Sequence, residues 1–498
     1  MNSASEVPNP GPKDPLLERR RAGVLLHPSS LPGEGAGGTL GPDAHRFLDV
    51  LAEGGMSVWQ MLPLGPTHED RSPYQCLSVH AGDPGLISRG LLEQWGWLDA
   101  GVAGPAEPWL ARAQAEFERG AGASERLALD YFVGAHRHWL EDYALYQALR
   151  QEQGGRPWWL WPQALRDRQP EALGRARDRL AAAIARVRFE QFVFFRQWQE
   201  LRQHAAQRDI LLFGDAPIFV AQDSADVWVY RHYFALDEQG QPRTVAGVPP
   251  DYFSKTGQRW GNPLYQWEEM RRDGFRWWRD RLRTQLALFD LLRIDHFRGF
   301  ESYWEIPAED PTAVNGRWVK APGEALFQAF REEFGRLPLV AEDLGYITEE
   351  VRALRDMFSL PGMRVLQFAF DGGPDNPYLP HRHEVNAVVY TGTHDNDTTL
   401  AWYDTLSDNQ QSYVVDYLGA PADPMPWSLI RAALGSVAVL AVLPMQDVLA
   451  LGTGNRMNTP GTITDNWQWR FTWDQLTTQT VTRLRHLARL YGRAADDR

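Results

Sequence analysis

The stretch LLRIDHFRGF, residues 291–300, is typical of a short buried strand that ends in charged side chains. A run rich in Leu and Ile needs apolar cover on both faces, as the strands of a parallel sheet have. Asp295 then lies at the carboxyl end of the strand, between Arg293 and His296. Barrel enzymes carry their catalytic residues at that end. The stretch therefore predicts a parallel α/β sheet with a carboxylate placed for chemistry.

Two further apolar stretches end in acidic side chains in the same way. They are LPLVAEDLG (337–345), with Glu342 and Asp343, and AVVYTGTHDND (387–397), with His394, Asp395 and Asp397. An Asp after a strand is often only the N-cap of the next helix. Charges of this kind are nevertheless costly to bury without partners, and here three strands share the pattern. We therefore expect carboxylates from all three strands to converge on one pocket.

Composition excludes several classes of protein. The chain has 498 residues, is 43% hydrophobic and contains 21 tryptophans. This length predicts two domains or one large barrel with insertions. No apolar run is long enough to span a bilayer, so we expect a soluble globular protein. The net charge of −13 argues against nucleic acid or an anionic membrane as a partner, because both require a basic face.

The N-terminal residues and the single cysteine bear on where the chain works. Cys76 has no intrachain partner for a disulfide and cannot build a cysteine zinc site, which fits a reducing cytoplasm. The opening MNSASEVPNPGPKDPLLERRR lacks the apolar core of a signal peptide. We predict a mobile N-terminal tail over residues 1–20, a single catalytic unit over 21–498, and a cytoplasmic location.

Apolar runs with turn-like ends recur along the chain, with helical segments between them. They are GVLLHPSSLP (23–32), SVWQMLPLGP (57–66), ILLFGDAPIFV (210–220), the 291 strand, the 339 strand, MRVLQFAFD (363–371), the 388 strand and VAVLAVLPMQD (437–447). This alternation of eight strands with helices predicts an α/β fold, a (β/α)8 TIM barrel. Two connections, about 67–209 and 221–288, are too long for plain crossovers. We expect them to be insertion subdomains over the C-terminal face of the barrel.

Aromatic residues in the first insertion have a structural explanation. Phe189, Phe192, Phe195 and Trp198 fall three residues apart, which predicts a buried stripe on one helix. PWWLWP (157–162) favours packing as well, although exposed tryptophan clusters are rare without a ligand.

The segment VAGVPPDYFSKTGQRWGNPLYQW (245–267) lacks helix or strand periodicity and carries several aromatic side chains. We predict an ordered loop whose aromatic faces, among them Tyr252, Phe253 and Trp260, stack on the apolar faces of sugar rings. The alternative is a loop that merely covers apolar surface, because such loops also need aromatic anchors.

Seven segments together resemble the signature sequences of one enzyme family. They are LHPSSLP, SPYQ, FGDAPIFV, NPLYQW, RIDHFRG, AEDLG and THDN. In this order, from about residue 21 to the C-terminus, they are similar to the amylomaltases, the bacterial 4-α-glucanotransferases of the α-amylase superfamily. The resemblance implies a barrel without the C-terminal β-domain of ordinary α-amylases. It also implies transfer of α-1,4-glucan segments between chains, with cyclic glucans possible by intramolecular transfer.

The resemblance also implies roles for the three acids: Asp295 as nucleophile, Glu342 as acid/base and Asp395 as transition-state stabiliser. Retaining glycoside chemistry needs one ionised carboxylate and one protonated carboxyl, roughly 5–5.5 Å apart. We expect Arg293 to hold Asp295 ionised, since both side chains can project to the same side of the strand. We expect the negative charge of Asp343 to help keep Glu342 protonated.

Other residues are predicted to bind the substrate or support the site. His394, with Asp395, can grip the hydroxyls of the distorted sugar ring, and Asp215 of FGDAPIF can support the top of the barrel. The remaining candidates, Tyr74, Tyr252, Phe253, Trp260, Asn466 and His296, follow from the resemblance or from their position in its motifs. AGDPG (81–85) departs from the Asn-Pro expected there, which leaves Asp83 without a predicted role.

Three alternatives stay open. A hydrolytic α-amylase-like enzyme would use the same three acids, and a catalytically dead glucan-binding protein would be expected to lack one of them. A phosphorylase is disfavoured, because the sequence has no Gly-rich phosphate loop and no evident pyridoxal lysine motif. We expect α-1,4-glucans and maltooligosaccharides as substrates, and no cofactor, metal ion or obligate protein partner.

Overall fold

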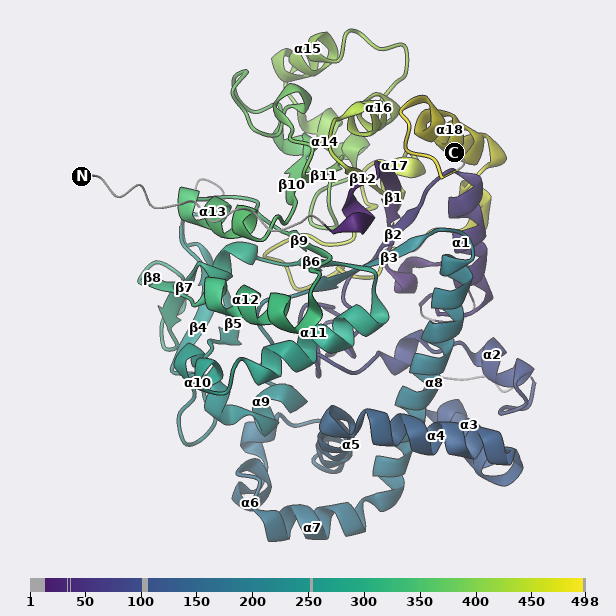
Figure 1. Cartoon of the computed structure of the whole chain (residues 1–498), viewed down its shortest axis with the longest axis vertical. Coiled ribbons are helices and arrows are strands. Elements are labelled where there is room, and N and C mark those ends of the chain that lie inside the picture. Colours follow the sequence, from purple (N-terminus) through teal and green to yellow (C-terminus); the bar gives the residue numbers. More distant parts are fainter. Residues whose placement is uncertain (1–13, 34, 36, 101–105, 251–253, 496–498) are drawn as a thin grey trace.

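A computed structural model describes residues 14–33, 35, 37–100, 106–250 and 254–495, and within them eight parallel strands form a ring (Figure 1). The strands are β1 (Arg21–Leu25), β2 (Val58–Gln60), β3 (Leu211–Ala216), β6 (Leu291–Ile294), β9 (Leu339–Ala341), β10 (Gly362–Val365), β11 (Ala387–Tyr390) and β12 (Leu440–Pro444). Between β9 and β10 the N–H of Ala341 donates to the carbonyl of Pro361 at 2.9 Å, which completes the ring. All eight strands lie where the sequence predicts them, so the barrel prediction is confirmed.

The barrel strands are buried on both faces, which explains their apolar sequences. Every residue of β1, β6, β9 and β11 is buried. Large side chains such as Phe213, Leu291 and Tyr390 pack together on the inner face, and the Tyr390 hydroxyl donates to Gln60 Oε1 at 2.9 Å. The interior of the barrel is therefore a packed core and not a pore.

The chain between the barrel strands, and after the last of them, forms helices around the barrel. They are α1 (Pro42–Glu53), α8 (Ala181–Ala206), α11 (Arg276–Leu288), α12 (Gly323–Phe334), α13 (Glu349–Met357), α14 (Thr399–Thr405), α15 (Asp408–Tyr417), α16 (Trp427–Gly435), α17 (Met445–Val448) and α18 (Thr478–Leu490). Helix α1 shows why these segments are helical: Ala44, Phe47, Leu48 and Leu51 recur at helical spacing and are all buried, while Asp43 lies in the first turn.

A buried arginine joins the first and last barrel strands. β1 pairs with β12 from Arg21 and Leu440 onward. The fully buried side chain of Arg493, just after α18, donates to the carbonyls of Arg21, Leu434, Ser436 and Ala438 at 2.7–2.9 Å. Burial lowers the pKa of Arg493 to about 9, so the guanidinium stays charged at neutral pH. Its hydrogen bonds thus tie the C-terminal helix to both strands at the seam of the barrel.

Residues 14–20 belong to the fold, so the prediction of a tail as far as residue 20 is wrong for this part. A short 3-10 helix, Pro15–Leu17, begins with the Asp14 side chain accepting from the N–H of Leu16, and Leu17 is buried. Arg20 donates to the carbonyl of Ser436 at 2.8 Å. Arg19 donates to the carbonyl of Ala494 at 3.0 Å, so this arginine too has a carbonyl acceptor at the amino end of the barrel. Residues 1–13 lie outside the described residues.

The first long connection is helical. Before α8 it contains α2 (Arg89–Gln94), α3 (Ala106–Gly120), α4 (Ala123–Ala135), α5 (Arg137–Glu152), α6 (Gln163–Arg166) and α7 (Pro170–Arg179). Helices α3 to α7 lie in the lower part of Figure 1. On α8, Phe189, Phe192 and Trp198 are buried, and Phe195 is partly buried against the same cluster. Trp158 and Trp161 of the PWWLWP segment are also buried. The prediction that these aromatics are core is confirmed.

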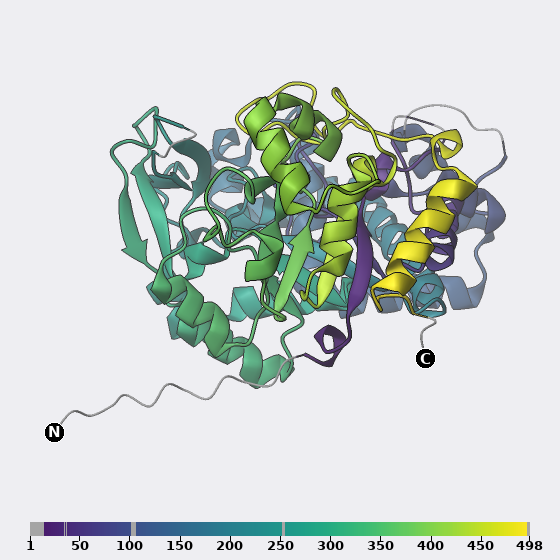
Figure 2. The same ribbon diagram turned by 90° about the horizontal axis from the view of Figure 1, so that it is seen from above.

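A second, antiparallel sheet in the order β5-β4-β7-β8 lies at the side of the barrel away from α18 (Figures 1 and 2). Its strands are β4 (Thr244–Val248), β5 (Gln258–Pro263), β7 (Ser302–Pro307) and β8 (Arg317–Lys320), and α9 (Ala225–Val229) and α10 (Trp267–Arg272) flank the first two. The prediction of a loop without strands over 245–267 is therefore wrong at both ends of that segment. Gly247 shows why. A Cβ at this position would lie 2.2 Å from the Gln258 carbonyl oxygen, so the close pairing of the strands requires glycine here. Glycine has no side chain and therefore interrupts the alternation of apolar and polar residues from which a strand is predicted.

Within the described ranges, every helix is too short or too polar to cross a lipid bilayer.

Candidate active site

Three charged side chains meet at the carboxyl ends of β3 and β6. Asp215 on β3 and Arg293 on β6 are both buried. Arg293 Nη1 donates to Asp215 Oδ2 at 2.6 Å, and Nη2 lies 2.9 Å from Asp295 Oδ1. Arg293 and Asp295 project to the same side because they are two residues apart, as the sequence predicts. One guanidinium therefore holds two carboxylates, one of them the candidate nucleophile.

Tyr74 and His394 form one wall of the site. The Tyr74 hydroxyl donates to Asp215 Oδ2 at 2.7 Å, and its ring stacks on the His394 ring with centroids 5.1 Å apart. The Trp467 ring lies 5.8 Å from the Tyr74 ring and 6.0 Å from the His394 ring. Burial lowers the pKa of His394. Its imidazole is thus neutral at pH 7 and can both donate and accept a hydrogen bond.

Glu342 follows β9 and is held by the loop that follows β6. The N–H of His296 donates to Glu342 Oε2 at 2.7 Å, and the N–H of Leu344 donates to Oε1 at 3.0 Å. His296 has a φ of 51°, a left-handed conformation that is uncommon for residues other than glycine. This turn lets the residue after Asp295 aim its N–H at Glu342. The candidate acid/base is therefore fixed relative to the candidate nucleophile.

Burial raises the pKa of both acids. For Asp295 it outweighs the lowering by Arg293, while Asp215, Glu342 and Asp395 raise the pKa further, to about 8. For Glu342 burial again dominates, against lowering by Arg293 and by two backbone N–H groups. The ion pair with Arg293 at 2.9 Å favours the negative charge on Asp295, whereas burial opposes a negative charge on both acids. Arg293 acts in the predicted direction, but burial decides the net shift.

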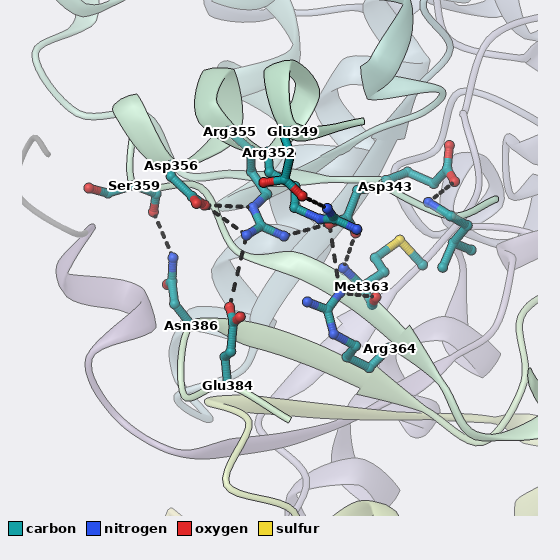
Figure 3. Close-up of polar contacts among 12 residues, drawn as sticks. Asp343, Glu349, Arg352, Arg355, Asp356, Ser359, Met363, Arg364, Glu384 and Asn386 are labelled. Carbon is teal, nitrogen blue, oxygen red and sulfur yellow. Dashed lines mark hydrogen bonds and ion pairs between the residues drawn. The ribbon is translucent and has the colours of Figure 1, made fainter. Parts of the chain in front are cut away.

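The Asp343 carboxylate lies in a network of charges with Arg355 and Arg364 (Figure 3). Its Oδ2 accepts from Arg355 Nη1 at 2.6 Å, and its Oδ1 accepts from the N–H of Met363, the second residue of β10, at 2.7 Å. Arg355 also pairs with Asp356 at 2.7 Å. The charge of Asp343 does raise the pKa of Glu342, as predicted, but it is the smallest of the causes and burial the largest.

Asp395 follows β11 and is contacted by the segment 456–458, which the prediction missed. Asn458 Nδ2 donates to Asp395 Oδ1 at 2.6 Å, and Arg456 Nη2 donates to the Asp395 carbonyl at 2.6 Å. His394 Nε2 lies 3.4 Å from Asp395 Oδ1. Asn458 and Arg456 lie in a loop far along the chain without any apolar strand beside them, so no pattern marks them in the sequence.

Asp447 is a second residue that the prediction missed, although a signal existed. It ends the apolar run 437–447 as the acids of the other strands end theirs. Its carboxylate is buried and accepts from Thr391 Oγ1 at 2.6 Å and from both the N–H and Oγ1 of Thr399 at 2.7 Å. Thr391 and Thr399 flank the loop that carries His394 and Asp395. Asp447 therefore fixes both ends of that loop and faces no substrate space.

The other predicted binding residues lie in different surroundings. Trp260 on β5 packs edge-on against the ring of His296, with centroids 4.8 Å apart, and is partly exposed. Asn466 is buried, and its amide is engaged within its own loop with Thr459 and Thr462. Tyr252 and Phe253 lie outside the described residues. His296 thus adjoins Asp295 and Glu342, and Trp260 packs beside His296, whereas the Asn466 side chain holds a loop.

The assembled groups suit chemistry at a glycosidic bond. Two carboxyl groups come from neighbouring strands, and an ion pair favours the negative charge on one of them, as a nucleophile beside a proton donor requires. A third carboxylate and a neutral imidazole can bind hydroxyls, and aromatic faces stand beside them. Among the described residues no cluster of His, Cys, Asp and Glu is arranged to hold a metal ion.

Comparison with known proteins agrees with this chemistry. The sequence matches the family described as 4-alpha-glucanotransferase over residues 26–477. It is 50% identical to the 4-alpha-glucanotransferase of Thermus thermophilus, over 94% of this chain and 98% of that protein, and 47% identical to that of Synechocystis sp., over 96% and 99%. The amylomaltase from Streptococcus agalactiae, solved in complex with acarbose, has a TM-score of 0.92 and 35% identity, covering 96% of this chain and 100% of that one. By its sequence, its barrel and its full-length likeness to these enzymes, the chain belongs to the 4-alpha-glucanotransferase family.

Proposed function

We propose that the chain moves α-1,4-glucan segments by a retaining double displacement, with Asp295 as nucleophile, Glu342 as acid/base and Asp395 as stabiliser of the transition state. The observation that carries the proposal is the hydrogen bond from the His296 N–H to Glu342, beside the ion pair of Arg293 with Asp295. Together they hold two carboxyl groups from β6 and β9 in a fixed relation, and the ion pair favours the negative charge on Asp295.

In the first step, Asp295 attacks the anomeric carbon of a donor glucan while Glu342 gives its proton to the departing 4-oxygen. The outgoing chain leaves, and a glycosyl ester remains on Asp295. In the second step, the now ionised Glu342 takes the proton from the 4-hydroxyl of an acceptor, whose oxygen attacks the same carbon and frees Asp295. Two inversions restore the α-configuration.

The surroundings of the acids support glucans as substrates. Positive charge builds up on the sugar ring in the transition state, and Asp395 with neutral His394 can hold the ring hydroxyls as it forms. Trp260 and Tyr74 supply aromatic faces for neighbouring sugars. The Streptococcus agalactiae amylomaltase was solved with acarbose bound, and we propose that maltooligosaccharides occupy the corresponding cleft here. The barrel and its two insertions would form one catalytic unit, acting in the cytoplasm, where a free thiol such as Cys76 persists.

The test uses a donor whose leaving group needs no proton. Glu342→Gln should lose transfer between maltotriose molecules by at least roughly 100-fold, the value of positioned acid/base catalysis. It should still react with α-glucosyl fluoride and, lacking a base for the second step, accumulate a glycosyl ester that mass spectrometry of the peptides locates on Asp295. The control is Glu349→Gln, which changes an exposed acid on α13. Equal slowing of both donors, or an adduct on another residue, would exclude these roles.

A further inference from the structure

The segment 456–458 lies along the loop that carries His394 and Asp395. The N–H of Asn458 donates to the His394 carbonyl at 3.1 Å, and its side chain donates to Asp395 Oδ1 at 2.6 Å. Arg456 donates to the Asp395 carbonyl at 2.6 Å and to the Asn458 carbonyl at 3.2 Å. Arg456 Nη1 also lies 3.8 Å from Asp397. The two segments come from different barrel strands, so these contacts set the position of one relative to the other.

Asp395 needs such a contact because its side chain is more exposed than that of the candidate nucleophile Asp295. Its side chain is 45% exposed, against 28% for Asp295. A carboxylate on a partly exposed loop can rotate about two side-chain bonds unless a partner holds one oxygen. The contacts of Asn458 and His394 both fall on Oδ1. Among the described residues no hydrogen bond reaches Oδ2, which is therefore the oxygen left to meet a sugar hydroxyl.

We infer that Asn458 is a positioning residue of the transfer reaction: its amide holds Asp395 Oδ1 so that Oδ2 faces the substrate. The inference rests on the proposed role of Asp395. Asn458 acts through that carboxylate, and its hydrogen bond matters most when the sugar approaches the oxocarbenium-like transition state. At that point the bond between the stabilising carboxylate and the 2-hydroxyl strengthens, so a rotated carboxylate loses more there than in the ground state.

This mechanism makes a specific demand on the substrate. If Asn458 acts through Asp395 and the 2-hydroxyl, its removal should slow a donor that has the 2-hydroxyl and spare one that lacks it. A purely structural role in the loop would slow both donors alike. α-Glucosyl fluoride and its 2-deoxy analogue form such a pair, with maltose as acceptor and fluoride release as the signal.

We expect Asn458→Ala to lower kcat/KM on α-glucosyl fluoride by about 10- to 100-fold, as the loss of one hydrogen bond to a charged group would. On the 2-deoxy donor the fall should stay below about threefold. In an Asp395→Asn background, adding Asn458→Ala should change either rate by less than about threefold, because residues that act as a unit are not additive.

The matched control is Asn455→Ala. Asn455 lies in the same segment and also uses its amide, donating to the Gly452 carbonyl and accepting from Trp469 Nε1, but it does not contact Asp395. It should slow both donors to the same degree if it slows them at all. The far-UV circular dichroism and the thermal midpoint of each variant show whether it is folded.

Three outcomes would overturn the inference. These are equal slowing of both donors by Asn458→Ala, the same donor preference in Asn455→Ala, and full additivity with Asp395→Asn. Ordinary activity of Asp395→Asn alone would instead remove the proposed role of Asp395, and the inference would fall with it. Nearly inactive Asp395→Asn beside unchanged Asn458→Ala would leave the proposed function intact and refute only the role of Asn458.

Discussion

Replacing Asp215 by Asn tests how the buried charges tune the nucleophile. The change keeps the shape of the side chain but removes one of the two carboxylate charges that pair with Arg293; the other is that of Asp295. Asp215 Oδ2 accepts from both Arg293 Nη1, at 2.6 Å, and the Tyr74 hydroxyl, at 2.7 Å. An amide oxygen in the same place can accept both bonds, but the amide nitrogen then takes the buried position of Oδ1, which has no hydrogen-bond partner among the described residues.

The cost to stability follows from these contacts. A hydrogen bond that involves a charged group is worth about 1 kcal/mol more than a neutral one, and leaving the amide N–H groups buried and unpaired costs about 1–3 kcal/mol. Arg293 keeps its ion pair with Asp295, so the full penalty for breaking a buried pair does not apply. We expect the free energy of unfolding to fall by about 3 kcal/mol, measured as a lower urea midpoint.

The same substitution should also shift the pH dependence of catalysis. The charge of Asp215 raises the pKa of Asp295, so its removal should lower that pKa. The nucleophile then stays ionised to lower pH, and the acidic limb of the kcat/KM profile on maltotriose should move to lower pH. The contrasting variant is Asp343→Asn, which also removes a buried acid from an arginine but adjoins Glu342. Because Asp343 raises the pKa of Glu342, its removal should move the basic limb to lower pH.

Movement of the acidic limb of Asp215→Asn to higher pH, or identical profiles for the two variants, would refute this electrostatic reasoning. If Asp215→Asn lost stability but kept the pH profile of kcat/KM unchanged, the charge of Asp215 would not affect the pKa of the nucleophile.

Three further variants test other parts of the site. Asp295→Ala should keep the fold and lose kcat by several orders of magnitude, because no other carboxylate can form the glycosyl ester; ordinary turnover in a folded variant would exclude Asp295 as nucleophile. Asp295→Asn should be more stable than the parent at pH 8. The pKa of Asp295 is raised in the folded state, so the contribution of Asp295 to the free energy of unfolding is lost as the pH rises from the ordinary pKa of an aspartate towards about 8. Urea midpoints at pH 5 and pH 8 should show this advantage growing with pH, and a constant difference would contradict it. Asp447→Asn should lower both the urea midpoint and kcat, because it leaves the hydroxyl donors of Thr391 and Thr399 facing an amide N–H. An unchanged kcat in a destabilised protein would show that other contacts hold the loop that carries Asp395.

The barrel and its acids could be predicted from the sequence because their signals are local. A strand buried on both faces must be apolar throughout, so each of the eight left a continuous run. Arg293 and Asp295 share a face for the same local reason, their separation by two residues. The prediction failed where pairing is non-local: β4 and β5 carry Gly and Pro, and β7, which pairs with β4, lies about 60 residues further on, a contact that no periodicity records.

The candidate site shows the same division. Asp295, Glu342 and Asp395 stand directly after apolar runs, whereas Asn458 reaches Asp395 from a loop with no pattern of its own. The direction of each charge effect could be predicted from neighbours in sequence, as for Arg293 on Asp295 and Asp343 on Glu342. The dominance of burial could not, because it depends on how loops from several strands close over the acids.

The pairing of β1 with β12, where the Arg493 side chain donates hydrogen bonds to carbonyls on both sides, closes the barrel. It therefore determines when this protein can first become active. The two strands that pair there lie at opposite ends of the sequence. At roughly 5–20 residues per second, synthesis of the intervening chain, about 420 residues, takes roughly 20–80 s. During that time β1 has an open edge and no partner on one side, and the loops that carry Asp395 and Asn458 have no closed barrel to stand on. A ribosome that stalls before residue 440 therefore leaves the edge of β1 without its partner strand, and an unpaired strand edge can pair with another chain.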